Sequence, residues 1–248
     1  MPRVEEIRAY LSELAPQQLA ESWDNVGTLV DCGGNITSVL TALDITDETV
    51  NEAEMAGCQL IVSHHPVIFH PLKSVDRTQP AYRMIKKNIS GICMHTNMDT
   101  AVGGVNDILA ALFGLQGVQK LEEMGRWGKL KMPMTVPQLA ALCRDRLGAG
   151  GVRMVDLGRP VQTLAVLGGA GGDFLAAAKA AGCDCLLTGE ASHHDALDAR
   201  RLGVALIAAG HFATEFPLMP VLAEKLRRRF PDLRVLVSKR GKDPFTYL

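Results

Sequence analysis

Short apolar runs alternate along the first half of the chain with longer amphipathic stretches. Four runs are short and apolar enough to be buried strands: Leu29–Val30, Ser38–Leu43, Leu60–Val62 and Ile92–Met94. Three longer stretches have the spacing or the end signals of helices: Asp47–Ala56, Pro80–Asn88 and Val105–Phe113. This alternation predicts an α/β fold with a largely parallel or mixed sheet.

The second half of the chain repeats this alternation. Its predicted strands and helices are, in order, Thr163–Leu167 (strand), Phe174–Ala181 (helix), Cys185–Leu187 (strand), Val204–Ala208 (strand) and Pro217–Phe230 (helix). Between the halves, residues 114–137 are rich in Gly and Met and weakly periodic, although Leu130–Met134 could pair as a strand. We therefore predict two α/β domains, residues 1–125 and residues 126–248.

The two predicted halves are also related in sequence. A 14-residue segment that ends at His65 aligns without gaps with a segment that ends at Glu190. In addition, each half has a His-x-x-x-carboxylate motif directly after a strand, at His95–Asp99 and at His211–Glu215. Open α/β sheets bind ligands at the C-terminal ends of their strands, so we expect these side chains to gather there.

Composition and charge exclude several classes of protein. Of the 248 residues 47% are apolar and 21% are charged, and the net charge of −1 gives no basic surface for nucleic acid. We expect a cytoplasmic protein without membrane spans, because the first helix is amphipathic and no apolar run reaches about 18 residues. The six cysteines form no CxxC pair, which indicates buried thiols rather than disulfides or structural zinc.

The histidines and carboxylates at the strand ends suit a two-metal site. Tandem His64 and His65 point in roughly opposite directions at the end of a strand, so the pair can serve two neighbouring cations. Two cations close together repel, so such a site needs bridging carboxylates. Asp99 and Glu215 suit that role, and His211 supplies another nitrogen. Imidazole and carboxylate ligands without thiolate fit two divalent transition metal ions per chain, chosen from Zn, Mn, Fe, Co or Ni.

Each motif alone also has a simpler explanation. A tandem His pair followed by Pro66 can be a loop after a buried strand. A His-x-x-x-carboxylate motif on a helix can be an ordinary i,i+4 surface pair. On spacing alone, the metal site and these simpler explanations both stay open.

The sequence resembles the NIF-three-like family of dinuclear metal-centre proteins, which are often described as homologues of GTP cyclohydrolase. The resemblance covers nearly the whole chain and lies in these stretches, which occur in the family's order: ESWDNVGTLV (21–30), LDIT (43–46), LIVSHHPVIFHPLKSV (60–75), MHTNMDTAVGGVND (94–107), GGAGGDFLAAAKAAGCDCLLTGEASHHDAL (168–197) and AGHFATEFP (209–217).

The resemblance implies a ligand set, a fold and an assembly. The family's metal ligands match His64, His65, Asp99, His211 and Glu215. The implied fold is two interlinked α/β domains, with the C-terminal segment packing back on the first domain and the metal site at the strand ends between them. The implied assembly is a ring-shaped homohexamer whose metal sites face an inner cavity.

Three further residues are candidates for catalysis. His95 could carry protons or support a metal ligand, Glu190 could act as a general base or cap a loop, and His194 matches a histidine of the family motif. The Trp23-Asp24-Asn25 segment could line the site, although we favour packing for Trp23 and a turn cap for Asp24. The glycines of residues 168–172 indicate a tight strand-to-helix turn rather than a phosphate cradle.

Two functions agree with these residues. The first is a metal-dependent hydrolase that acts on a phosphoester, a nucleotide or a purine-type ring, GTP cyclohydrolase-like by resemblance only, with two metals lowering the pKa of a bound water. The alternative is a non-catalytic metal-handling or partner-binding hexameric factor.

Overall fold

The computed structural model describes residues 1–248 and divides into two compact units. The first unit consists of Met1–Val102 and Leu218–Lys242, and the second of Gly103–Pro217 and Asp243–Leu248. The sequence placed the division near residue 125. The chain instead enters the second unit at Gly103, because residues 103–125 form a helix and an edge strand that pack with the second sheet. The fold is mixed α/β with two sheets, as predicted.

The first unit is built on a five-stranded sheet with the order β1-β4-β3-β2-β11. Its strands are β1 (Gly27–Val30), β2 (Ser38–Ala42), β3 (Leu60–Ser63), β4 (Ser90–Cys93) and β11 (Arg234–Val237). Strands β4, β3, β2 and β11 are parallel, and β1 pairs antiparallel with β4. Because β2, β3 and β4 run the same way, their C-terminal ends lie at one edge of the sheet.

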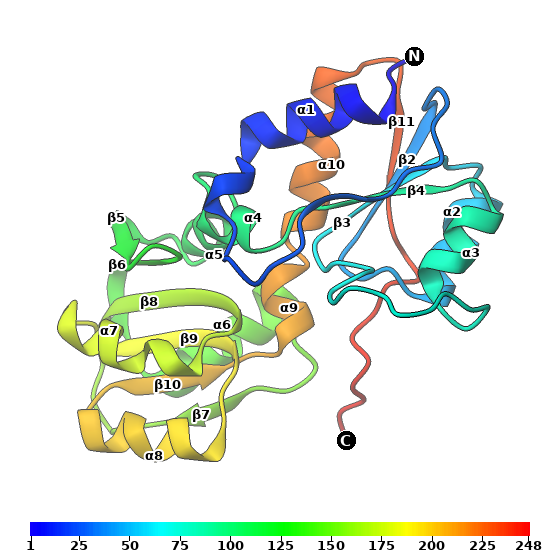
Figure 1. Cartoon of the computed structure of the whole chain (residues 1–248). Helices are drawn as coiled ribbons and strands as arrows, with labels where there is room; N and C mark the ends of the chain where they lie inside the picture. The colour runs from blue at the N-terminus through cyan, green and yellow to red at the C-terminus, as the bar shows by residue number, and fades with distance from the viewer. The chain divides into compact units, whose positions relative to one another are not determined.

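Helices cover both faces of this sheet. The first unit contains α1 (Val4–Leu14), the 3₁₀ turn η1 (Gln17–Leu19), α2 (Asp47–Met55), α3 (Pro80–Lys86), α4 (Thr96–Thr100) and α10 (Leu218–Arg229). Figure 1 shows α2 and α3 on one face and α10 on the other. Helix α1 packs on the end of α10, where the Tyr10 ring meets the edge of the Phe230 ring at 5.8 Å between centroids.

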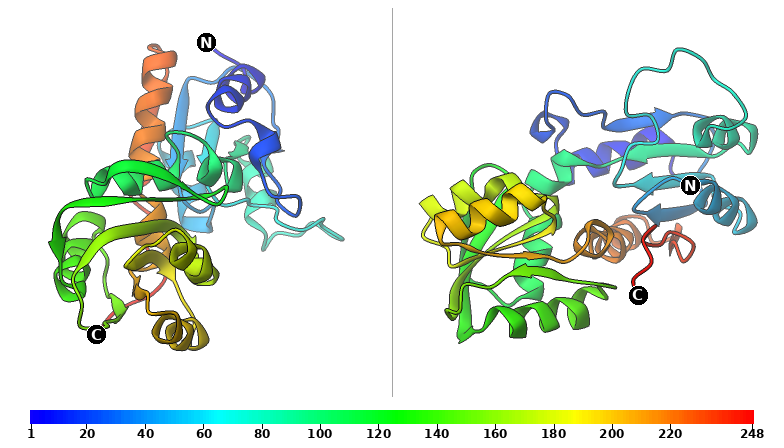
Figure 2. Two further views of the ribbon diagram at one scale, coloured as in Figure 1. Left: turned by 90° about the vertical axis from the view of Figure 1, so that its left-hand side faces the viewer. Right: turned by 90° about the horizontal axis from the view of Figure 1, so that it is seen from below.

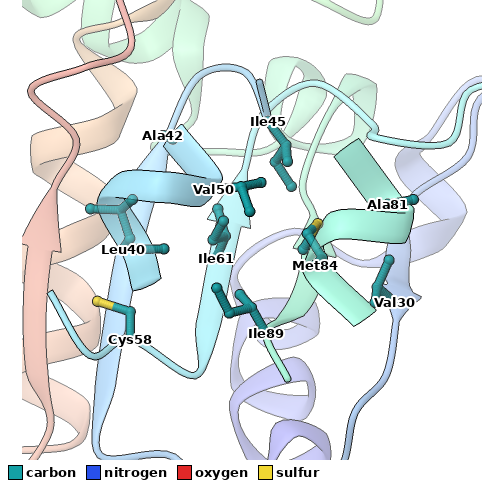
Figure 3. Close-up of a cluster of buried hydrophobic side chains, with 11 residues drawn as sticks. Val30, Leu40, Ala42, Ile45, Val50, Cys58, Ile61, Ala81, Met84 and Ile89 are labelled. Atoms are coloured by element: carbon teal, nitrogen blue, oxygen red, sulfur yellow. The ribbon is translucent and has the colours of Figure 1, made fainter. Parts of the chain in front are cut away.

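The core of the first unit lies between the sheet and the α2–α3 pair (Figure 3). Leu40, Ile61 and Met84 are fully buried there, and burial of apolar surface of this kind is the main term that stabilises a fold. A Cβ on Gly91 would lie 2.7 Å from the Met84 side chain, so the glycine lets α3 approach β4 closely. Thr46 caps the N-terminus of α2, where its hydroxyl accepts a hydrogen bond from the Thr49 amide.

The second unit is built on a six-stranded mixed sheet with the order β5-β6-β8-β9-β10-β7. Its strands are β5 (Gln116–Leu121), β6 (Gly125–Met134), β7 (Arg153–Val155), β8 (Val161–Ala170), β9 (Cys185–Glu190) and β10 (Ala205–Ala208). The central strands β8, β9 and β10 are parallel. Residues 114–137 are therefore mostly a hairpin of this sheet, which their weak periodicity did not indicate, and the strand suggested at Leu130–Met134 is the second half of β6. Strand β5 is almost wholly exposed, so its sequence lacks the apolar signal of a strand.

Helices cover both faces of the second sheet as well. They are α5 (Val105–Leu112), α6 (Val136–Leu147), the 3₁₀ turn η2 (Gly172–Phe174), α7 (Leu175–Ala180), α8 (His193–Leu202) and α9 (His211–Glu215). The right-hand view of Figure 2 shows α7 and α8 on one face and α6 on the other. None of these helices, in either unit, combines the length and the apolar character that spanning a membrane requires.

The predicted internal repeat corresponds to β2-α2-β3-α3-β4 in the first unit and β8-α7-β9-α8-β10 in the second. The strand register agrees with the sequence alignment. Leu60 pairs with Ser90 on β4, and its aligned match Cys185 pairs with Ala205 on β10. Each unit therefore has three parallel strands that deliver side chains to one edge of its own sheet.

Candidate metal centre

Strand β3 delivers the tandem histidines of the first unit. The His64 amide donates to the Ala42 carbonyl at 3.3 Å and the His65 amide to the Leu43 carbonyl at 2.9 Å, so the pairing with β2 continues past the strand end. This pairing fixes the backbone of both histidines. The His64 side chain is fully buried and 23% of the His65 side chain is exposed.

His95, which follows β4, joins this pair. The three imidazole rings lie 5.0 to 5.4 Å apart between centroids. One nitrogen from each of His64, His65 and His95 lies within 4.8 Å of the others, which is close enough for a metal ion to contact them together. The sequence predicted that these residues would gather, and within the first unit they do.

A hydrogen bond at Nδ1 orients each of the three rings. Each Nδ1 has an oxygen partner at 2.7 to 2.8 Å: the Met94 carbonyl for His64, the Asp44 carboxylate for His65 and the Asp24 carboxylate for His95. An oxygen acceptor at Nδ1 holds the proton there, so the neutral ring presents its lone pair at Nε2. Metal-binding histidines in proteins are commonly oriented in this way.

Asp99 adds a buried carboxylate to the group. It lies in the short helix α4, and its Oδ1 is 3.5 Å from Nε2 of His64. The start of α4 is fixed by Asp24, whose Oδ2 accepts a hydrogen bond of 3.0 Å from the Thr96 amide. One aspartate thus positions both the His95 ring and the helix that carries Asp99.

Asp24 is held as an anion. Its burial raises the pKa, but hydrogen bonds from His95 and Thr96 and the charge of His95 outweigh burial and lower the pKa from 3.8 to about 2. The sequence suggested a turn cap for Asp24. The structure adds the contact with His95, which spacing alone could not show because the two residues are 71 positions apart.

The second unit holds a group of its own at the ends of β9 and β10. Nε2 of His211 lies 3.1 Å from Oε2 of Glu215, and its Nδ1 lies 3.4 Å from Oε1 of Glu190. The Glu215 side chain is only 5% exposed, whereas that of Glu190 is 49% exposed. His211 therefore lies between a buried and an exposed carboxylate.

The two His-x-x-x-carboxylate motifs are offset by one residue between the repeats. When the two repeats are aligned by their paired strand residues, His95 corresponds to Gly210. These two residues are the N-caps of α4 and α9. His211 is accordingly the first residue of its helix, whereas His95 precedes its helix. The motifs look alike in sequence, but the two histidines hold different positions, which is consistent with different roles.

Gly168 and Gly169 of β8 make room for Glu215. A Cβ on Gly169 would overlap Oε1 of Glu215, and the backbone there has φ +66°, which favours glycine. A Cβ on Gly168 would lie 2.7 Å from Val105 and 3.4 Å from the Glu215 side chain. The Gly169 amide also donates a hydrogen bond of 3.1 Å to the hydroxyl of Thr214, in the same helix as Glu215. These two glycines belong to the strand and not to the turn that the sequence predicted.

His194 is not part of either group. It lies exposed in the first turn of α8, where its ring contacts that of His193 at 5.7 Å between centroids. The turn itself is fixed by a capping box between Ser192 and Asp195. A catalytic role for His194 stays a prediction.

The donor atoms fit divalent transition metals. The first unit offers imidazole nitrogens with oriented rings and one carboxylate, and the second offers an imidazole between two carboxylates, a set that suits Zn, Mn, Fe, Co or Ni. Thiolate plays no part: burial, with the charges of Asp24 and Asp99, raises the pKa of Cys93, and its thiol donates to the His64 carbonyl at 3.0 Å.

Asp44 is the site residue that sequence reasoning missed. It follows β2, the third of the parallel strands, and its carboxylate is the partner of His65 Nδ1 at 2.7 Å. The signal was its place in the sequence, directly after a buried strand that ends at the same edge as β3 and β4. Every one of these three strands thus delivers a polar side chain to the group.

Comparison with known proteins shows the family of this chain. The family described as Duf34/NIF3 (NGG1p interacting factor 3) matches residues 2–244. A GTP cyclohydrolase 1 type 2 homolog of Streptomyces coelicolor is 38% identical, with 99% of this chain and 94% of the relative covered. A GTP cyclohydrolase 1 type 2 of Helicobacter pylori is 34% identical, with 91% and 92% covered. The crystal structure of the Staphylococcus aureus protein SA1388 has a TM-score of 0.91 at 29% identity and covers 99% of both chains. The chain therefore belongs to the Duf34/NIF3 family.

Proposed function

We propose that this protein is a metal-dependent hydrolase with a dinuclear centre. The ligands in this proposal are the five residues expected from the sequence: His64, His65, Asp99, His211 and Glu215. The observation that carries the proposal is the orientation of the histidines in the first unit, where every Nδ1 has an oxygen partner and one nitrogen of each ring lies within 4.8 Å of the others. Histidines that bind metal almost always donate their second ring N–H to an oxygen in this way.

The residues have distinct roles in this proposal. When bound, the metals supply Lewis acidity toward water and the substrate's oxygen atoms. The Asp44 carboxylate orients the His65 ring and the Met94 carbonyl orients the His64 ring. Gly169 leaves the space that Glu215 fills.

His95 is the proposed proton carrier. Its Nδ1 is held by ionised Asp24, as in Asp–His pairs that fix the tautomer of a general base, and its Nε2 can take or give a proton. Glu190, beside His211 and half exposed, is a second candidate for moving protons. His194 is a weaker one, because its ring contacts His193 and neither group above includes it.

The substrate class proposed from the family is a phosphoester, a nucleotide or a purine-type ring. The support is the name of the Helicobacter pylori relative, GTP cyclohydrolase 1 type 2, together with a donor set that suits anionic oxygen. The proposed assembly is a homohexamer, which mass photometry of the purified chain tests directly.

A substrate screen tests the hydrolase. Purified protein loaded with Mn or Zn is assayed against p-nitrophenyl phosphate, bis-p-nitrophenyl phosphate and nucleoside triphosphates. We expect turnover that EDTA abolishes and that His64→Ala removes, while the control His70→Ala, an exposed histidine outside both groups, keeps it. His95→Ala should lower turnover by about a hundredfold with unchanged metal content. Stoichiometric metal without turnover on any substrate would favour the metal-handling factor instead.

A further inference from the structure

A pocket of about 660 Å³ lies in the second unit at the C-terminal ends of β9 and β10. Glu190 and His211 line it. Phe245 and Tyr247, from the last six residues of the chain, line it as well. The pocket is of a size that accepts a small organic molecule, and it adjoins the histidine that we propose as a metal ligand.

The C-terminal segment, residues 243–248, is fixed on this unit by Tyr247. Its ring lies on the backbone of Gly150 and Gly151, where a Cβ on Gly151 would come within 2.5 Å of the ring and one on Gly150 would overlap it. The Tyr247 hydroxyl donates to Asp243 at 3.0 Å, and the Phe245 amide donates to the same carboxylate at 2.9 Å. Asp243 thus folds the segment into a defined shape.

Phe245 remains exposed while it lines the pocket. Its relative exposure is 68%, although an apolar ring at the chain end could have packed against the fold. Glycines replace side chains elsewhere in the lining, at Gly189 and Gly210, so flat surfaces of backbone and ring border the same space. An exposed aromatic ring in a pocket is the usual platform for stacking a planar ligand.

One positively charged and one negatively charged side chain also line the pocket. Arg153 lines the pocket and is oriented by a hydrogen bond of 2.9 Å from its guanidinium to the Ala191 carbonyl. Glu190 lines it with a half-exposed carboxylate. A purely hydrocarbon ring would desolvate these groups without pairing them, whereas a heteroaromatic ring carries acceptors for the guanidinium and donors for the carboxylate at its edge.

We propose that this pocket binds a planar heteroaromatic ring, stacked on Phe245, with Arg153 and Glu190 facing the ring edge. The role of this pocket as a substrate subsite rests on the proposed function, because the pocket would place the ring of a nucleotide-like substrate beside His211. In this proposal the C-terminal segment, residues 243–248, forms part of the binding site for the ring.

Adenosine and ribose are a matched pair of probes for the ring, because ribose lacks it and neither carries a phosphate that could bind metal. Isothermal titration of the full-length, EDTA-treated protein should detect adenosine binding and no ribose binding. Phe245→Ala should weaken adenosine binding by about five- to a hundredfold, the range for loss of one base–aromatic stack. The control Phe69→Ala, an exposed phenylalanine of the first unit, should leave binding unchanged. Gly150→Ala, which displaces the Tyr247 ring, should weaken binding as Phe245→Ala does.

Equal adenosine affinity in wild type and Phe245→Ala, or competition by ribose, would overturn the inference. Metal content, measured on the same samples, separates it from the proposed function. Adenosine binding without stoichiometric metal would contradict the proposed hydrolase function and support the ring-binding pocket. Metal-dependent turnover, with no effect of Phe245→Ala on adenosine binding or on KM, would contradict the ring-binding pocket and support the proposed hydrolase function.

Discussion

Replacing Asp24 with asparagine should remove a contribution to stability that depends on pH. Asparagine keeps the shape of the side chain but cannot carry the negative charge that His95 and Thr96 stabilise. The pKa of Asp24 falls from 3.8 to about 2 in the folded protein, and at about 1.4 kcal/mol per pKa unit this corresponds to about 2 kcal/mol of stability near neutral pH.

The sign of the pH dependence follows from the lowered pKa. A carboxyl whose folded pKa lies below its unfolded value stabilises the fold fully above the unfolded value. That contribution is lost as the pH falls toward the folded value, so we expect about 2 kcal/mol at pH 6 and about 1 kcal/mol at pH 3. The difference in unfolding free energy between wild type and Asp24→Asn should therefore shrink as the solution is acidified.

Urea unfolding of the EDTA-treated proteins between pH 3 and pH 7, followed by circular dichroism, measures this difference. The matched control is Asp76→Asn, because Asp76 also accepts hydrogen bonds from a threonine hydroxyl and amide, those of Thr78, but is exposed to water. The control should change stability by less than Asp24→Asn at every pH. A difference for Asp24→Asn that is the same at pH 3 and pH 6, or no larger than that of the control, would refute the reasoning.

Three further substitutions test other parts of the structure. Gly169→Ala should destabilise the fold by about 1–3 kcal/mol and lower metal content, because alanine is strained at this positive φ and its Cβ overlaps Glu215; unchanged melting temperature and metal content would contradict this. Asp44→Asn should weaken zinc binding by about 10- to 100-fold in a chelator competition, because His65 loses the carboxylate that orients it, and an unchanged affinity would show that the contact does not matter. Thr46→Ala should cost about 1 kcal/mol in urea unfolding through loss of the α2 cap, with metal content unaffected; a neutral effect would mean that the cap is replaced by water.

The central strands, and the strand ends that carry the candidate metal-site residues, could be predicted because they follow from strong local signals. Buried parallel strands are continuous apolar runs, and β2, β3 and β9 stand out from their neighbours for that reason. The polar residues that follow such strands share one edge of a sheet, which is why His64, His65 and His95 were expected together. The internal repeat supported the same conclusion.

The parts that were missed lack such a signal. Strand β5 is exposed at a sheet edge, and the boundary near residue 103 falls inside a continuous motif without a change of composition. The roles of Asp44 and Gly169 depend on contacts across 21 and 46 positions of the chain, to His65 and Glu215, which no local pattern contains. Long-range contacts of this kind appear only when the sheet order is known.

Metal content per chain tests the central claim most directly. Elemental mass spectrometry of the untagged protein, with Asp99→Ala as the variant and His70→Ala as the control, compares the ligand set with a histidine outside it. The account predicts about two transition metal ions per chain in wild type and control, and a sharp fall in Asp99→Ala. No stoichiometric metal in wild type, even after Zn, Mn or Fe is added back, would contradict it.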